Sequence, residues 1–274
     1  MEQTITPSLN ANALKIIAVT AMIVDHSTFW LVSSNSALYV ILRMFGRFAA
    51  PIMCYLIAEG YFHTSNKKKY MKRLFIFALI SHYPYILYFD LTSLQATSVI
   101  WGLFTGFLAL AISQSKEMPL ILKVFFILIC CLLSWTADWN YISVLWILSF
   151  GIFRKNFRLQ ILFFILIGLI FYILPGFSFS DSNSIFRLGI FFVIPLLASY
   201  DGTLGKKSFL MKWSFYIIYP GHLLLLYVLR YFFFEGGIGD EKKQKSYLGD
   251  NTRIVSGSRC WFDYFYSTKN FLNK

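Results

Sequence analysis

The chain has 274 residues, of which 57% are hydrophobic, 20% aromatic and only 14% charged, and its mean hydropathy is +0.61. This composition excludes an ordinary soluble domain and indicates a polytopic membrane protein. The formal net charge of +12 does not indicate nucleic-acid binding, because the basic residues lie mainly in short loops between apolar runs rather than along one amphipathic face.

Long apolar stretches predict an all-α fold, a polytopic transmembrane helix bundle of about nine spans. A spanning helix needs about 20 mostly apolar residues. The predicted spans cover roughly residues 13–33, 38–59, 71–89, 96–112, 119–136, 140–153, 159–175, 185–200 and 212–234. The sixth is short and could be re-entrant. No basic residue precedes the first apolar run and no small-residue cleavage signal follows it, so we expect a retained helix rather than a signal peptide.

The distribution of lysine and arginine predicts the orientation of the bundle. Alternate loops are basic, whereas the loops between them contain almost no Lys or Arg. The basic loops and their flanks hold Lys67, Lys68, Lys69, Lys72, Arg73, Lys116, Lys123, Arg154, Lys155, Arg158, Lys206, Lys207 and Lys212. By the positive-inside rule these loops and the N-terminus are cytoplasmic. Only if the sixth segment spans does the basic loop at 154–158 fall on that side.

The composition changes near Gly236, after which the chain is polar and its aromatic residues are too few and too interrupted to span a membrane. We therefore divide the chain into a transmembrane domain, residues 1–235, and a polar tail, residues 236–274. The tail has no periodic apolar face, which is typical of an unstructured extension. We assign it no function.

The four cysteines do not predict a metal site. Three of them lie inside apolar spans, and their spacing does not match a set of metal ligands, so we expect buried free thiols. They are Cys54, Cys130, Cys131 and Cys260.

Asp25 and His26 lie side by side in the middle of the first span. A charge at bilayer depth is costly and is normally tolerated only where it faces other polar groups or a cavity. Counted from Ala13 at a rise of about 1.5 Å per residue, the pair lies about 18 to 20 Å from the inner face. Arg43 and Arg47, near the outer end of the second span, reach a similar depth.

Arg43 and Arg47 are four residues apart and therefore share one helix face. Their guanidinium groups stay charged and need carboxylates, phosphates or water within the bundle, and Asp25 is the nearest candidate. One interpretation is a structural ion pair that fixes helix register. The other is catalytic: an aspartate orients or charges a histidine while the arginines bind an anion or stabilise an oxyanion. Adjacent helical residues point about 100° apart, so Asp25 could act through another helix rather than on His26.

Glu59 and His63 lie at the inner end of the second span, next to the lysine cluster. Glu59 could pair with Lys72 or Arg73, or could contact a cytosolic cofactor, and the sequence does not choose. His63 is predicted to be a solvated loop residue.

The remaining two histidines each lie close to a proline inside an apolar span. His82 precedes Pro84, and His222 follows Pro220, whose missing N–H can expose carbonyl groups toward a cavity. A lone histidine in such a span is either a hydrogen-bonded interior residue or a functional group.

Several motifs together resemble the TraX family, named for the F-pilin acetylase of conjugative plasmids. The resemblance covers about residues 13–232 and is most specific between Arg43 and Tyr85. The family's D-H corresponds to Asp25 and His26, its R-x-x-G-R to Arg43, Gly46 and Arg47, its A-E-G to Glu59 and Gly60, and its terminal P-x-H to Pro220 and His222. At the glutamine of the family's S-Q-x-P this chain has His82, so a role for that position does not carry over.

The resemblance implies a multi-pass acetyltransferase of the bacterial inner membrane. Such a protein moves an acetyl group from acetyl-CoA to an acceptor, for example the N-terminal amine of a pilin, another peptide or an envelope component. His26 would then be the base and Asp25 its orienter, with an arginine as oxyanion donor. The candidate catalytic residues are His26, Asp25, Arg43, Arg47, Glu59 and His222.

A cytosolic basic loop is the candidate contact for the acyl donor. Acetyl-CoA is highly anionic, so Lys67, Lys68 and Lys69 could attract its phosphates. The same lysines also suffice as topology signals.

Two other functions fit the same residues. In a proton-coupled transporter, Asp25, His26 and His222 would form a relay through the bundle and the substrate would cross unchanged. The odd number of spans and the absence of a repeat disfavour the common inverted-repeat carriers. In a membrane assembly factor the ion pairs would be structural, and isosteric replacement of Asp25 would leave activity unharmed.

Overall fold

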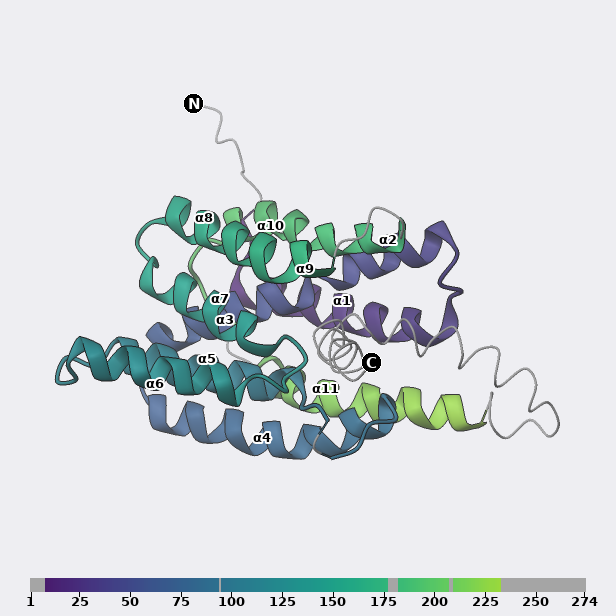
Figure 1. Cartoon of the computed structure of the whole chain (residues 1–274), viewed down its shortest axis with the longest axis horizontal. Helices are drawn as coiled ribbons and strands as arrows, with labels where there is room; N and C mark the ends of the chain where they lie inside the picture. The colour runs from purple at the N-terminus through teal and green to yellow at the C-terminus, as the bar shows by residue number, and fades with distance from the viewer. Residues whose placement is uncertain (1–7, 94, 177–181, 207–208, 233–274) are drawn as a thin grey trace, which may run out of the picture.

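The computed structural model describes residues 8–93, 95–176, 182–206 and 209–232, and these form an all-helical bundle whose longer helices run roughly along one axis (Figure 1). The helices are α1 (Ala11–Leu31), α2 (Ala37–Gly46), α3 (Ala49–His63), α4 (Lys67–Tyr88), α5 (Val99–Ser113), α6 (Leu120–Leu133), α7 (Asn140–Ile152), α8 (Phe157–Gly168), the π-helix η1 (Leu169–Ile173), α9 (Leu174–Gly176), the 3₁₀ helix η2 (Ser182–Val193), α10 (Ile194–Ala198) and α11 (Phe209–Arg230). The predicted all-α fold is confirmed for these residues.

Each predicted span overlaps helical structure, although three of them are composite: the second is α2 with α3, the seventh is α8 with η1 and α9, and the eighth is η2 with α10. Three helical stretches of the described chain are long and apolar enough to cross a bilayer, namely Ala11–Leu31, Ala37–His63 and Phe157–Gly176. The shorter α7 has about 20 Å of helical rise and is buried along most of its length. The nine-span topology and the cytoplasmic N-terminus stay predictions.

The outer surface of the bundle exposes many apolar side chains, which would be unfavourable in water. Along α6, Cys130 is the only residue classed as buried, while Leu120 and Ile121 are 75% and 82% exposed. A helix that is hydrophobic all round needs an apolar environment on every side. This surface fits contact with lipid.

Glycines allow α5 and α7 to pack closely at the centre. A Cβ at Gly102 would lie 2.5 Å from the hydroxyl of Ser143, and one at Gly106 would collide with Ile147. Small residues four apart on one helix face let two helix backbones approach each other in a membrane. This packing holds the short α7 within the bundle.

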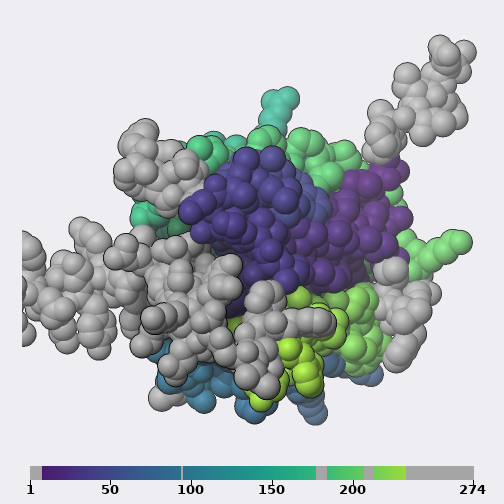
Figure 2. All heavy atoms as spheres, turned by 90° about the vertical axis from the view of Figure 1, so that its right-hand side faces the viewer, coloured from purple at the N-terminus to yellow at the C-terminus, as the bar shows by residue number. Residues whose placement is uncertain are grey.

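Contacts between distant segments define two ends of the bundle. We name them the inner and the outer end after the membrane sides that the charge pattern predicts. At the inner end, the backbone N–H of Leu9 donates to Ser199 (2.7 Å), and that of Ala11 donates to Thr203 (2.9 Å). At the outer end, the N–H of Thr97 donates to Thr136 (2.7 Å). Figure 2 views the molecule from the outer end, where α2 and the last turns of α11 reach the surface.

The inner end unites segments that the charge pattern assigns to the cytoplasmic side. The start of α1 meets the segment after α10 there, and the end of α3 meets the α7–α8 connection through an ion pair between Glu59 and Arg154. The remaining cysteine, Cys260, and the whole predicted tail of residues 236–274 lie outside the described residues.

Candidate functional site

A cavity of about 540 Å³ opens between α1, α2, α3, α4 and α11 toward the outer end. Its lining is mostly apolar and aromatic, with a few charged or titratable groups, as is common in binding sites. The ionisable residues that line it are Asp25, His26, Arg43, Arg47, Tyr85, Asp138, Tyr172, Arg187 and Tyr219. Four of the six predicted catalytic residues therefore line one cavity.

Asp25 is held between the two arginines, as the sequence predicts. Its Oδ2 accepts from Nη1 of Arg43 at 2.8 Å and also from Nη2 of Arg47. All three side chains are only 12 to 13% exposed. One carboxylate thus meets two guanidinium groups, which leaves one excess positive charge in a largely buried site.

Gly46 explains why a glycine separates the arginines in this motif. A Cβ at this position would collide with the side chain of Asp25. The absence of a side chain lets α2 approach α1 closely enough for both arginines to reach the same carboxylate oxygen.

Aromatic rings stack against the guanidinium groups. The ring of Phe186 lies 5.1 Å from Cζ of Arg43 and 5.4 Å from Cζ of Arg47, and the ring of Trp139 lies 5.6 Å from Arg47. Arg47 also donates from Nη1 to the hydroxyl of Tyr172 at 3.3 Å. Cation–π contacts of this kind hold the cations without neutralising them, so the positive charge stays available to an anionic group.

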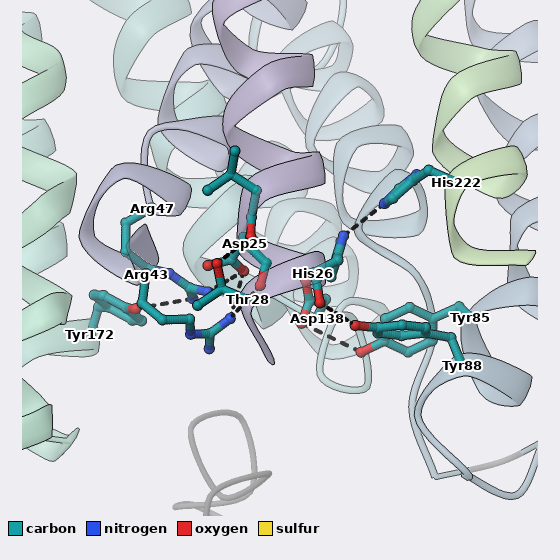
Figure 3. A network of polar contacts seen from close by, with 11 residues as sticks. Asp25, His26, Thr28, Arg43, Arg47, Tyr85, Tyr88, Asp138, Tyr172 and His222 are labelled. Atoms are coloured by element: carbon teal, nitrogen blue, oxygen red, sulfur yellow. Dashed lines mark hydrogen bonds and ion pairs between the residues drawn. The ribbon is translucent and has the colours of Figure 1, made fainter. Parts of the chain in front are cut away.

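His26 points toward His222 of α11, on the side of α1 opposite to the arginines (Figure 3). Nδ1 of His26 lies 2.8 Å from Nε2 of His222, and Nδ1 of His222 lies 2.8 Å from the carbonyl of Ile218. A carbonyl only accepts, so Nδ1 of His222 carries the proton and its Nε2 accepts from His26 when both rings are neutral. This assignment leaves Nε2 of His26 with a free lone pair.

The structure decides between the two arrangements that the sequence left open for Asp25 and His26. His222, not Asp25, hydrogen-bonds His26 and fixes its orientation, because Asp25 and His26 point to different sides of α1, as the 100° step between helical neighbours allows. The hydroxyl of Tyr88 further anchors this turn by donating to the carbonyl of His26 at 2.6 Å.

Asp138 is a cavity residue that the sequence analysis missed. It lies in the connection between α6 and α7, where its backbone N–H donates to Thr97 (3.0 Å) and its Oδ1 accepts from Tyr85 (3.4 Å). Burial raises the pKa of its carboxyl group, and the charge of Arg47 opposes that shift. The sequence places Asp138 in a predicted outer loop, at the start of a block, DWNYISVLWILSFGIFRK, that shares in the family resemblance, but it assigns this residue no role.

Tyr172 and Arg187 are two further cavity residues that the sequence analysis missed. Nη1 of Arg187 donates to the carbonyl of Tyr172 at 3.2 Å, and the two residues come from η1 and η2. Both residues lie inside predicted spans, at 159–175 and 185–200, and an ionisable residue inside an apolar span was the signal that could have identified Arg187.

Glu59 lies away from the cavity, at the inner end of α3. Its carboxylate accepts from Arg154 at 2.9 and 3.1 Å and lies 3.3 Å from His63. Of the two alternatives that the sequence left open, the structure shows neither Lys72 nor Arg73 as the partner, and contact with a cofactor stays a prediction. The hydrogen bonds to Glu59 raise the pKa of Arg154. His63 is not simply a solvated residue, because its ring contacts both Glu59 and Arg154.

The lysine cluster lies on the exposed first turn of α4. The ammonium of Lys67 lies 4.0 Å from the ring centroid of Tyr61, and Lys67, Lys68 and Lys69 line neither of the two large cavities. Their contact with the phosphates of an acyl donor therefore stays a prediction that neither cavity supports.

His82 is part of neither cluster: it lines neither cavity, and its buried Nδ1 has no hydrogen-bond partner among the described residues. Cys54, Cys130 and Cys131 are free thiols, the first two buried. The described residues contain no group of three or more His, Cys, Asp or Glu side chains that could hold a metal ion.

Comparison with known proteins places these residues in a family. The family described as "TraX protein" matches residues 10–230. The chain is 30% identical over 236 residues to a protein of Dichelobacter nodosus named "Probable fimbrial assembly protein FimC, serogroup H1", and the match covers 79% of this chain and 94% of that protein. No solved structure matches. Since the match spans α1 to α11 and includes every residue of the Asp25 and His26 clusters, the chain belongs to the TraX family.

Proposed function

We propose that this protein is an acetyltransferase of the bacterial inner membrane that moves an acetyl group from acetyl-CoA to an amine of a pilin or another envelope component. One observation carries the proposal: a histidine with a free lone pair and a pair of arginines with an excess positive charge line the same cavity. A base and a cationic oxyanion site are the two elements that acyl transfer needs.

The chemistry assigns a role to each group. The acyl donor supplies a thioester carbonyl. Nε2 of His26 takes a proton as the acceptor nitrogen attacks that carbonyl, and Arg43 and Arg47 stabilise the negative charge on the carbonyl oxygen. The new N–C bond replaces the C–S bond, and His26 returns the proton to the departing sulfur, so the products are an acetyl amide and a free thiol.

His222 is a positioning residue in this scheme. By accepting from Nδ1 of His26, it holds the ring in the tautomer that leaves Nε2 basic, a role that a carboxylate plays in many hydrolases. Asp25 keeps the two guanidinium groups side by side. Glu59 is too far along α3 to take part in the same step and is a structural partner of Arg154.

The nature of the acceptor rests on two supports. The similar protein from Dichelobacter nodosus is named for fimbrial assembly, which favours a pilin subunit. The second carboxylate of the cavity, Asp138, offers a contact for a cationic amine before it loses its proton.

The test uses purified full-length protein in lipid nanodiscs with radiolabelled acetyl-CoA and a peptide that has a free N-terminal amine. We expect label transfer by the wild type, a loss of at least 100-fold in His26→Ala, and none to a peptide with a blocked N-terminus. His63→Ala is the matched control, since this histidine lies outside the cavity. Full turnover by His26→Ala would remove the proposed base from the mechanism.

A second candidate function, proton-coupled transport, is favoured by the same buried histidine pair, because two hydrogen-bonded imidazoles can pass a proton. In that case the His26→Ala protein would lose substrate flux and no acetylated product would form with the wild type. Mass spectrometry of envelope fractions from cells with and without this protein separates the two functions.

A further inference from the structure

A second cavity of about 530 Å³ lies at the inner end, between α1, α3, α4, α11 and the segment after α10. Hydrogen bonds hold that last segment in place, including one from the side-chain amide of Asn12 to the carbonyl of Lys206 at 2.8 Å. Nothing in the proposed chemistry uses this cavity.

The inner cavity is lined by three basic side chains: Lys15, Arg73 and Lys206. One carboxylate, that of Glu59, also lines it, but both of its oxygens are bonded to Arg154. Basic side chains therefore outnumber acidic ones in the lining of this cavity. An anionic ligand would complement this lining.

Arg73 is built into the wall. Its Cζ lies 5.0 Å from the ring of Tyr70 and 5.1 Å from that of Tyr216, and both tyrosines line the cavity. Its Nε is buried and has no hydrogen-bond partner among the described residues. A planar cation held on aromatic rings, with a donor unused, is suited to bind a phosphate.

Two side chains separate the inner cavity from the outer one. Met53 of α3 and Phe215 of α11 line both cavities and are 6% and 5% exposed. Along α1, ten residues separate Lys15 of the inner cavity from Asp25 of the outer cavity, a rise of about 15 Å. Methionine is unbranched and adapts its shape readily, so this partition is thin and deformable.

We propose that the inner cavity binds the phosphate groups of the acyl donor and that the donor's slender uncharged arm passes between Met53 and Phe215 to present the thioester in the outer cavity. This inference rests on the proposed acetyltransferase function. It places the donor's charges on Lys15, Arg73 and Lys206 rather than on the exposed lysines of α4, and it brings donor and acceptor to the reacting groups from opposite ends of the bundle.

Binding of coenzyme A itself, without an acyl group, tests the anion site separately from turnover. We expect Arg73→Gln and Lys15→Gln each to weaken equilibrium binding of radiolabelled coenzyme A about tenfold, the loss of one charge-assisted contact, and Arg73→Lys to restore part of it. The triple variant Lys67→Gln, Lys68→Gln, Lys69→Gln is the control and should bind as the wild type does. Thermal unfolding in nanodiscs verifies that each variant is folded.

Filling the partition tests the passage. Met53→Trp, or the smaller Met53→Phe, should lower acetyl transfer at least tenfold and also weaken binding of coenzyme A, whereas binding of adenosine 3′,5′-bisphosphate, which has phosphates but no arm, should stay within about twofold of the wild type. Normal transfer by both folded variants would overturn the passage.

The outcomes separate the two proposals. Unchanged coenzyme A binding by the Arg73 and Lys15 variants, or no binding by the wild type, overturns the inner site. Wild-type binding that weakens in these variants, together with no acetylated product, supports an anion site here and overturns the transferase.

Discussion

At each end of the bundle one carboxylate lies between two nitrogen-bearing side chains, but the surroundings differ. At the outer cavity, Asp25 meets Arg43 and Arg47, and all three side chains are 12 to 13% exposed. At the inner end, Glu59 is 8% exposed but Arg154 is 38% exposed. Because a solvated partner is screened by water and a buried one is not, the ion pair at the inner end is expected to be weaker than those at the outer cavity.

The two clusters also differ in the position of their histidine. The second partner of Glu59, His63, lies 3.3 Å from the carboxylate, whereas His26 points away from Asp25 and bonds to His222. Because His26 and Asp25 point apart, the lone pair on Nε2 of His26 stays free while the carboxylate of Asp25 holds the two arginines side by side. Three predictions examine this difference.

The largest effect is expected from Asp25→Asn, because it leaves two largely buried guanidinium groups without a counter-charge. Removing one partner of a buried ion pair costs about 3 to 5 kcal/mol, so we expect a strong loss of thermal stability in nanodiscs and of acetyl transfer. Asp90→Asn is the matched control, because Asp90 is 53% exposed beside Arg230. If Asp25→Asn is as active and stable as the wild type, the cluster is neither catalytic nor structural and the contrast between the two ends fails.

Gly46→Ala should have an intermediate effect. The added Cβ collides with Asp25, so α2 must shift and the arginines lose their shared carboxylate oxygen, at an expected cost of about 1 to 3 kcal/mol. The control is Gly221→Ala in α11, where a Cβ meets nothing within 4 Å. Equal melting temperatures for the two alanine variants would show that close approach of α1 and α2 is not required.

Glu59→Gln should have the smallest effect. With Arg154 more than one-third exposed, the pair contributes about 1 kcal/mol or less, and we expect a small fall in melting temperature, diminished at high salt, with acetyl transfer retained. The measurement is thermal unfolding at low and high salt alongside the transfer assay. A loss of transfer as large as that of His26→Ala would place the inner pair in the mechanism.

Much of the site could be predicted because helical spacing is local. The four-residue step from Arg43 to Arg47, and the depth at which Asp25 must lie, follow from helix geometry alone, and the structure confirms their contact. The partner of Glu59 could not be predicted in this way, since Arg154 lies 95 residues further along the chain.

The sequence by itself determined the helical fold, the apolar surface and the grouping of Asp25 with Arg43 and Arg47, because hydrophobic period and burial cost act within one helix. Only the tertiary structure decided that His26 pairs with His222, 196 residues away, that Asp138 joins the cavity, and that Met53 and Phe215 divide two cavities. These outcomes depend on how helices pack side by side, and packing is set by contacts between faces that the order of residues along the chain does not record.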